Sequence, residues 1–196
     1  LSGRMGTELP PPLTQFHHPS YLILQKVFKF FGGAFHIFDP SGNIVFYSKQ
    51  KAFKLKEDMS TELLVIRTDQ IIDLGVTYHV HDPQQGGVHM GSLKREGSKS
   101  ILRDRWLFLD PAGRQIGTIQ EDSTARARLR RLVVGWLLPQ KYFGTIGNTP
   151  VSLFARNFNP FVSKVQLDYL MDTQSLLDRR MGIAAAVLLL AIEGKQ

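Results

Sequence analysis

The sequence predicts a mainly β protein, in which about 12 antiparallel strands form a closed barrel around a buried hydrophobic C-terminal α-helix. Three observations lead to this fold class. Short runs rich in β-branched and aromatic residues recur along the chain, turn signals separate them, and the last long apolar segment has a helical composition. Antiparallel strands must bury one face, and a helix that is apolar all round must be covered on every side. A barrel wrapped around the helix meets both needs at once.

Three turn signals combine Asp and Pro with a glycine that follows shortly after. They lie at residues 38–43, 81–87 and 109–114. The Asp side chain can cap such a turn, Pro presets φ, and Gly accepts a positive φ. We therefore expect three antiparallel hairpins at these places.

The expected strands are short and evenly spaced, as in a β-barrel or sandwich. They are residues 21–29, 34–38, 44–48, 52–56, 63–66, 77–80, 87–94, 106–109, 115–119, 141–146, 150–157 and 164–169. Residues 123–138 fit two patterns, an amphipathic helix with an apolar face or a strand in which Arg alternates with apolar residues. We favour the short helix, which Pro139 ends in either case.

The C-terminal segment 181–192 contains no charged residue. A membrane-spanning helix needs about 20 apolar residues, and Arg180 and Glu193 bound this segment on either side. We therefore expect a core helix at about residues 175–193 rather than a membrane anchor. Residues 1–19, which include four prolines, are expected to form a flexible leader, and residues 20–196 a single barrel domain.

The charge of the chain is concentrated in one segment. The 24 Lys and Arg residues exceed the 17 Asp and Glu residues and give a net charge of +7. Residues 123–167 contain seven basic residues and no acidic one, so the rest of the chain is balanced. A local positive excess indicates an anionic partner. The absence of cysteine excludes a disulfide scaffold, a thiolate metal site and a cysteine nucleophile.

Four arginines in this segment are the main candidate contacts for an anion: Arg126, Arg128, Arg130 and Arg131. The planar guanidinium group matches phosphate oxygens with two parallel hydrogen bonds, as a phosphorylated headgroup requires. Lys54 and Lys56 would share one face of a strand and are further candidates. The alternative is a solvated basic face without a ligand.

Three histidines could approach one another on neighbouring strands. His79 and His81 are two residues apart and would share one face, and His89 follows on the next expected strand. Three imidazoles can bind zinc, but surface or packed histidines are commoner, so neither a metal nor another cofactor is expected. The chain has no phosphate-binding glycine loop, no His-Glu-x-x-His and no Gly-x-Ser-x-Gly motif, and no enzymatic activity is expected.

Three motifs in the same order resemble those of the phospholipid scramblase and LURP-one-related branch of the Tubby C-terminal-like superfamily. They are the hairpin at residues 35–43, the segment at 156–161, and residues 177–181 leading into the apolar helix. The resemblance covers about residues 21–193 and implies a 12-stranded barrel closed around a central helix. It also implies phosphoinositide binding through basic residues on the barrel. The chain lacks the family's palmitoylated cysteine cluster and a convincing calcium loop, so scramblase activity is not expected.

The sequence thus predicts a non-enzymatic binding module that holds anionic phospholipid headgroups, located in the cytoplasm and peripheral at a membrane. Two alternatives remain open. One is a protein-interaction or structural module without a lipid ligand, and the other, less favoured, is nucleic-acid binding, which would be sensitive to salt.

Overall fold

The computed structural model describes residues 14–28, 32–49, 54–56, 62–68, 75–96, 105–122, 140–157 and 162–193. Within these ranges the chain forms twelve strands, one turn of 3-10 helix and one α-helix. The strands are β1 (Ser20–Phe28), β2 (Gly32–Phe38), β3 (Ile44–Lys49), β4 (Lys54–Lys56), β5 (Glu62–Thr68), β6 (Thr77–Asp82), β7 (Val88–Glu96), β8 (Arg105–Leu109), β9 (Gln115–Glu121), β10 (Gln140–Ile146), β11 (Thr149–Arg156) and β12 (Ser163–Asp168). The helices are η1 (Pro83–Gln85) and α3 (Arg179–Glu193). Every expected strand is present, with bounds shifted by a few residues at most.

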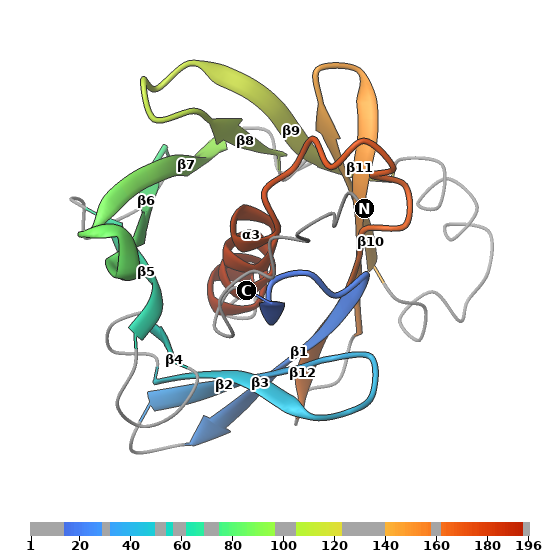
Figure 1. Cartoon of the computed structure of the whole chain (residues 1–196). Coiled ribbons are helices and arrows are strands. Elements are labelled where there is room, and N and C mark those ends of the chain that lie inside the picture. The colour runs from blue at the N-terminus through green and yellow to red at the C-terminus, as the bar shows by residue number, and fades with distance from the viewer. Residues whose placement is uncertain are drawn as a thin grey trace, which may run out of the picture.

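All strand pairs are antiparallel, and consecutive strands pair with one another along the chain. The first strand, β1, also pairs with the last, β12, through a register that runs from Ser20↔Asp168 to Gln25↔Ser163. The junction between β3 and β4 consists of a single residue pair, Tyr47↔Lys56. The mainly β class is therefore confirmed, and the strands curve around α3 (Figure 1).

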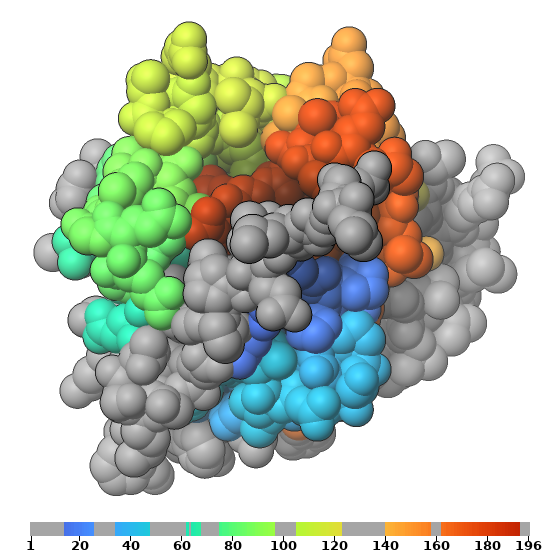
Figure 2. All heavy atoms as spheres, viewed as in Figure 1, coloured from blue at the N-terminus to red at the C-terminus, as the bar shows by residue number. Residues whose placement is uncertain are grey.

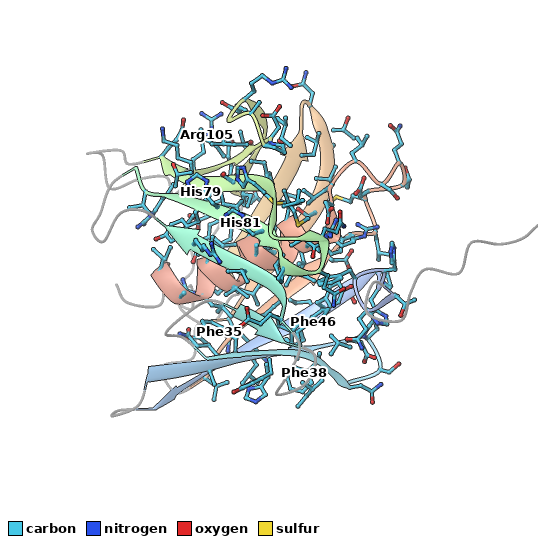
Figure 3. The ribbon with its side chains drawn as sticks, turned by 60° about the vertical axis from the view of Figure 1, so that its left-hand side comes forward. Phe35, Phe38, Phe46, His79, His81 and Arg105 are labelled. Carbon is cyan, nitrogen blue, oxygen red and sulfur yellow. The ribbon has the colours of Figure 1, made fainter. Side chains whose placement is uncertain are left out.

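Side chains alternate between the two faces of the sheet, as the pleat requires. Tyr21 and Ile23 of β1 are fully buried, and Phe35 and Phe46 on neighbouring strands point to the same side (Figure 3). Each residue of α3 from Met181 to Ala191 is buried as well. In the space-filling view, α3 shows only as a narrow strip between its neighbours (Figure 2). The core is therefore the interface between the inner face of the sheet and the entire circumference of the helix.

The helix begins at Arg179, four residues later than the predicted start near residue 175. The reason is the conformation of the preceding segment. The carboxylate of the buried Asp172 accepts hydrogen bonds from the backbone N–H groups of Leu176 (2.8 Å) and Leu177 (3.1 Å), and Ser175 has φ of 53°. Asp178 then caps the helix, because its carboxylate accepts from the backbone N–H of Arg180 at 2.9 Å.

The Asp-Pro turns are confirmed and share one design. Asp39 accepts from the backbone N–H of Asn43 at 2.9 Å, and Asp110 accepts from that of Arg114 at the same distance. Gly42 and Gly113 supply the positive φ, 83° and 79°. Side-chain capping of this kind satisfies the backbone of a tight turn without other partners.

The antiparallel order places these turns at one end of the sheet. This turn end comprises residues 39–43, 82–87, 110–114 and 146–149, together with the segment 169–178 that leads into α3. The opposite, or far, end is where β5, β7, β9 and β11 finish and β6, β8, β10 and β12 begin.

Residues 14–19, assigned from sequence to a flexible leader, contact the sheet, since Phe16 is buried and stacks on Phe46 of β3 with ring centres 4.6 Å apart. The short helix expected at residues 123–138 lies outside the described residues. No helix in the described part of the chain has the length and apolar character needed to cross a membrane.

The turn at Asp39 provides a test by titration. The hydrogen bonds from the side chain and the backbone of Asn43 lower the pKa of Asp39 below its ordinary value of 3.8. A lowered pKa means that the carboxylate stabilises the folded turn above the unfolded-state pKa, and that this contribution is lost as the pH falls through the folded-state pKa. Asn43→Ala should raise the pKa of Asp39, as measured from carboxyl carbon shifts by NMR. The pKa of Asp110, which Arg114 lowers in the same way, serves as the control and should not change.

Gly182 of α3 lies directly against Tyr169, the residue that follows β12. A Cβ there would collide with the ring and the hydroxyl of Tyr169, which is buried. Gly182→Ala should therefore lower the free energy of unfolding by about 1–3 kcal/mol, although alanine favours a helix. Urea unfolding measures this change. In a Tyr169→Phe background, where the hydroxyl is gone, the same substitution should cost less, and equal costs in both backgrounds would contradict the packing argument.

Candidate functional site

The four candidate arginines, Arg126, Arg128, Arg130 and Arg131, lie outside the described residues. Lys54 and Lys56 form the two ends of β4, as expected, but their side chains are also outside the described part of the structure. The proposed headgroup contacts of all six residues therefore stay predictions.

Basic side chains do gather at the far end of the sheet, at the ends of strands that are separate in sequence. Within the described residues they are Arg67, Lys94, Arg95, Arg105, Lys141, Arg156 and Lys164, against the acidic Glu96, Glu121 and Asp122. Glu96 is paired with Arg105, with a shortest N–O distance of 3.2 Å. The antiparallel order thus brings Lys94, Arg95 and Arg105 to the same end of the sheet as Lys141, Arg156 and Lys164.

Residues 123–167 contain no acidic residue and are called the acid-free segment below. Three of its seven basic residues are described, and they lie on different faces of the sheet. Lys141 and Lys164 are exposed, while Arg156 is only 8% exposed. Between the two lysines, β11 pairs with both β10 and β12, for example through Ala155 with Lys141 and with Gln166. Alternation puts both lysines on the outer face. Arg156 projects to the inner face and is not available to a surface ligand.

The turn end has the opposite charge. Its described acidic residues are Asp39, Glu62, Asp82, Asp110, Asp168, Asp172 and Asp178, and its described arginines are Arg114, Arg179 and Arg180. All six aspartates accept hydrogen bonds from backbone N–H groups of turns, loops or the start of α3, which hold their side chains close to the chain. Among the residues that the structure describes, one end of the sheet is therefore acidic and the other basic.

A buried ion pair joins the start of α3 to the sheet. Arg180 Nη1 lies 2.7 Å from Asp82 Oδ2, and Asp82 is almost fully buried. The same guanidinium contacts Asp178 at 2.7 Å. Burial alone would lower the pKa of Arg180, but the hydrogen bonds and charges of Asp178 and Asp82 outweigh it and raise the pKa. Arg180 is therefore a permanent cation between two carboxylates.

A second set of contacts fixes Arg179, the residue before Arg180. The Tyr169 hydroxyl donates to the carbonyl oxygen of Arg179 at 2.8 Å, and the Arg179 guanidinium lies over the Tyr169 ring at 4.2 Å from its centre. Burial raises the pKa of Tyr169 well above its ordinary value, so the ring is a neutral hydrogen-bond donor. These contacts hold the first turn of the helix and offer no free reactive group.

The structure brings the three candidate histidines together. His79 and His81 lie on β6 with Val80 between them (Figure 3), and His81 pairs directly with His89 of β7. Ring centres lie 5.2 Å apart for His79 and His89, and again 5.2 Å apart for His81 and His89. Because Val80 and Asp82 of β6 are buried on the inner face of the sheet, the alternation of side chains places His79 and His81 on its outer face.

Ser92 links two of these rings. Its hydroxyl oxygen is 2.9 Å from His79 Nδ1 and 2.9 Å from His89 Nε2, and the residue is buried. Burial lowers the pKa of His89, and the neighbouring His81 and His79 lower it further. A serine between two imidazoles could suggest a nucleophile with its base, but a substrate could not reach this buried hydroxyl.

Sequence reasoning did not identify Ser92 or the Asp82–Arg180 pair. Ser92 becomes visible only through the register of β6 with β7, in which it lies opposite His79. Asp82 and Arg180 are 98 residues apart, and no sequence pattern connects them.

Comparisons of the chain with models of known protein families, with curated proteins and with solved structures find no match in any of the three. Among the described residues, no group of three or more His, Asp or Glu side chains is arranged as it stands to hold a metal ion.

The ion pair at the start of α3 gives a matched pair of variants. Asp82→Ala leaves the half-buried Arg180 without its buried partner and should lower the free energy of unfolding by about 3–5 kcal/mol. Asp178→Ala removes the helix cap and a carboxylate beside the same arginine that is 40% exposed, and it should cost only about 1 kcal/mol. Chemical unfolding of both variants measures the difference. Similar losses in the two would show that burial of Asp82 does not determine its contribution.

Proposed function

We propose that this protein is a non-enzymatic binding module whose basic end holds anionic phospholipid headgroups at a membrane surface. The observation that carries the proposal is the separation of charge between the two ends of the sheet. The turn end is acidic, whereas strand ends from β5 to β12 supply basic residues at the far end. A membrane with anionic lipids attracts such a face, and each basic residue near the surface contributes about 1 kcal/mol.

Exposed lysines support the proposal better than the charge count alone. Lys141 on β10 and Lys164 on β12 project from the outer face on either side of β11, and both belong to the acid-free segment 123–167. The same segment contains Arg126, Arg128, Arg130 and Arg131, which we propose as additional headgroup contacts together with Lys54 and Lys56.

We further propose that the sheet is a closed barrel of the Tubby C-terminal-like type. Supporting features are the pairing of β1 with both β2 and β12 and the burial of α3 on all sides. Closure depends on the short β3–β4 junction. The protein would then work in the cytoplasm, peripheral at a membrane, with the far end of the barrel facing the lipid.

Vesicle co-sedimentation tests the function. The wild-type protein should bind vesicles that contain phosphatidylserine or phosphoinositides and should not bind neutral phosphatidylcholine vesicles. Lys141→Ala and Lys164→Ala should each weaken binding about fivefold, the equivalent of 1 kcal/mol. The combined Arg126, Arg128, Arg130 and Arg131→Ala variant should weaken it much more. Added salt should reduce binding in each case.

Arg114→Ala is the matched control, because it removes one exposed positive charge from the turn end. It should leave vesicle binding unchanged. Equal binding to anionic and neutral vesicles, or equal losses for Arg114→Ala and Lys141→Ala, would overturn the proposal. Salt-sensitive binding to an oligonucleotide without a preference for anionic lipid would assign the basic end to nucleic acid instead.

A further inference from the structure

We propose that the turn end of the sheet is a docking surface for a protein partner whose binding segment combines apolar residues with Lys or Arg. The surface centres on Leu170, Met171 and Leu176, in the segment that leads into α3. It lies at the opposite end of the sheet from the basic far end, and it is independent of lipid binding.

Exposed apolar side chains concentrate at the turn end. Among the described residues, seven large apolar side chains are exposed, and six of them lie in the segment 169–178 or within two residues of a turn at this end. These six are Ile44, Val88, Ile116, Leu170, Met171 and Leu176. Single exposed apolar residues are ordinary on a protein surface, whereas a concentration of them indicates a binding surface.

The segment before α3 carries the most exposed of these side chains, and Figure 2 shows it in orange-red on the outside of the molecule. Leu170 is 72% exposed, Leu176 is 42% exposed and Met171 is 37% exposed. Contact with a partner would remove this apolar surface from water, which is the main source of favourable free energy in protein association.

The two exposed leucines are held in place by hydrogen bonds of their own backbone. The N–H of Leu170 donates to Asp168 Oδ1 at 2.7 Å, and the N–H of Leu176 donates to Asp172 Oδ1 at 2.8 Å. Asp172 is itself buried, as is Tyr169, the residue before Leu170. A surface that is already fixed in its binding conformation loses little conformational entropy when a partner binds.

The charge of the turn end indicates which kind of partner fits. Its described side chains include seven carboxylates and only three arginines, and each of these arginines lies beside an aspartate. The exposed apolar side chains therefore lie at an end with excess negative charge. An anionic membrane would be repelled by this end, whereas a protein segment with Lys or Arg next to its apolar residues matches both features.

Fluorescence anisotropy of labelled synthetic peptides, titrated with the full chain, tests the proposal. The probe is an amphipathic peptide of Leu and Lys, and two matched peptides replace either its Lys by Glu or its Leu by Ser. The wild-type protein should bind the Leu/Lys peptide about tenfold or more tightly than either matched peptide, because only this peptide carries both features. Leu170→Ser and Leu176→Ser should each weaken its binding about tenfold, since each removes apolar surface that the peptide would cover.

Val162→Ser is the matched control, because it removes an exposed apolar side chain from the far end. It should leave peptide binding unchanged. Equal affinity for the three peptides, no binding to any of them, or equal losses for Val162→Ser and Leu170→Ser would overturn the proposal.

Two further measurements on Leu170→Ser distinguish the peptide-like partner from other occupants of the surface. Its binding to anionic vesicles and its sedimentation in analytical ultracentrifugation should equal those of the wild type. Loss of vesicle binding would show that these side chains enter lipid, and loss of self-association would show that a second copy of the chain covers them. Either result would overturn the proposal, whereas a wild-type protein that binds the Leu/Lys peptide but no vesicles would contradict only the lipid function.

Discussion

The structure depends above all on the burial of α3 around its whole circumference. Residues 181–191 are all buried, and a helix without a polar face can be stable only if apolar surface covers every side. The curved sheet provides that surface through the inner side chains of its strands, among them Phe35, Phe46 and Phe154. Neither the helix nor the sheet could expose its apolar face to water without the other, so the two must fold as one unit.

Apolar burial alone would not fix how the helix is rotated and positioned, because the hydrophobic effect has no direction. Polar contacts at its first turn provide the direction. Arg180 reaches Asp82 on the sheet, and Tyr169 holds the carbonyl oxygen of Arg179. Gly182 allows the Tyr169 ring to lie against the helix. The start of α3 is therefore fixed at the turn end by directional contacts, and the rest of the helix is held by apolar packing.

The same meander order distributes charge and chemistry over the surface. Alternate connections lie at the same end, so the Asp-Pro turns gather at one end and basic strand ends at the other. The proposed membrane-binding end and the histidine cluster occupy different parts of this frame. His79, His81 and His89 lie on the outer face of β6 and β7, where the register of two strands, and not a loop, sets their spacing.

By itself, the sequence determined the positions of the strands, the three capped turns and the apolar helix, because strand periodicity, turn chemistry and helix composition are local signals. It also identified the histidines of the cluster, since residues two apart must share a strand face. Only the tertiary structure decided which residues meet across the chain. The late helix start needed the carboxylate of Asp172, and the Asp82–Arg180 pair spans 98 residues. The burial of Arg156 and the place of Ser92 between two imidazoles likewise depend on strand register and on the face each side chain takes, and both are set by long-range packing.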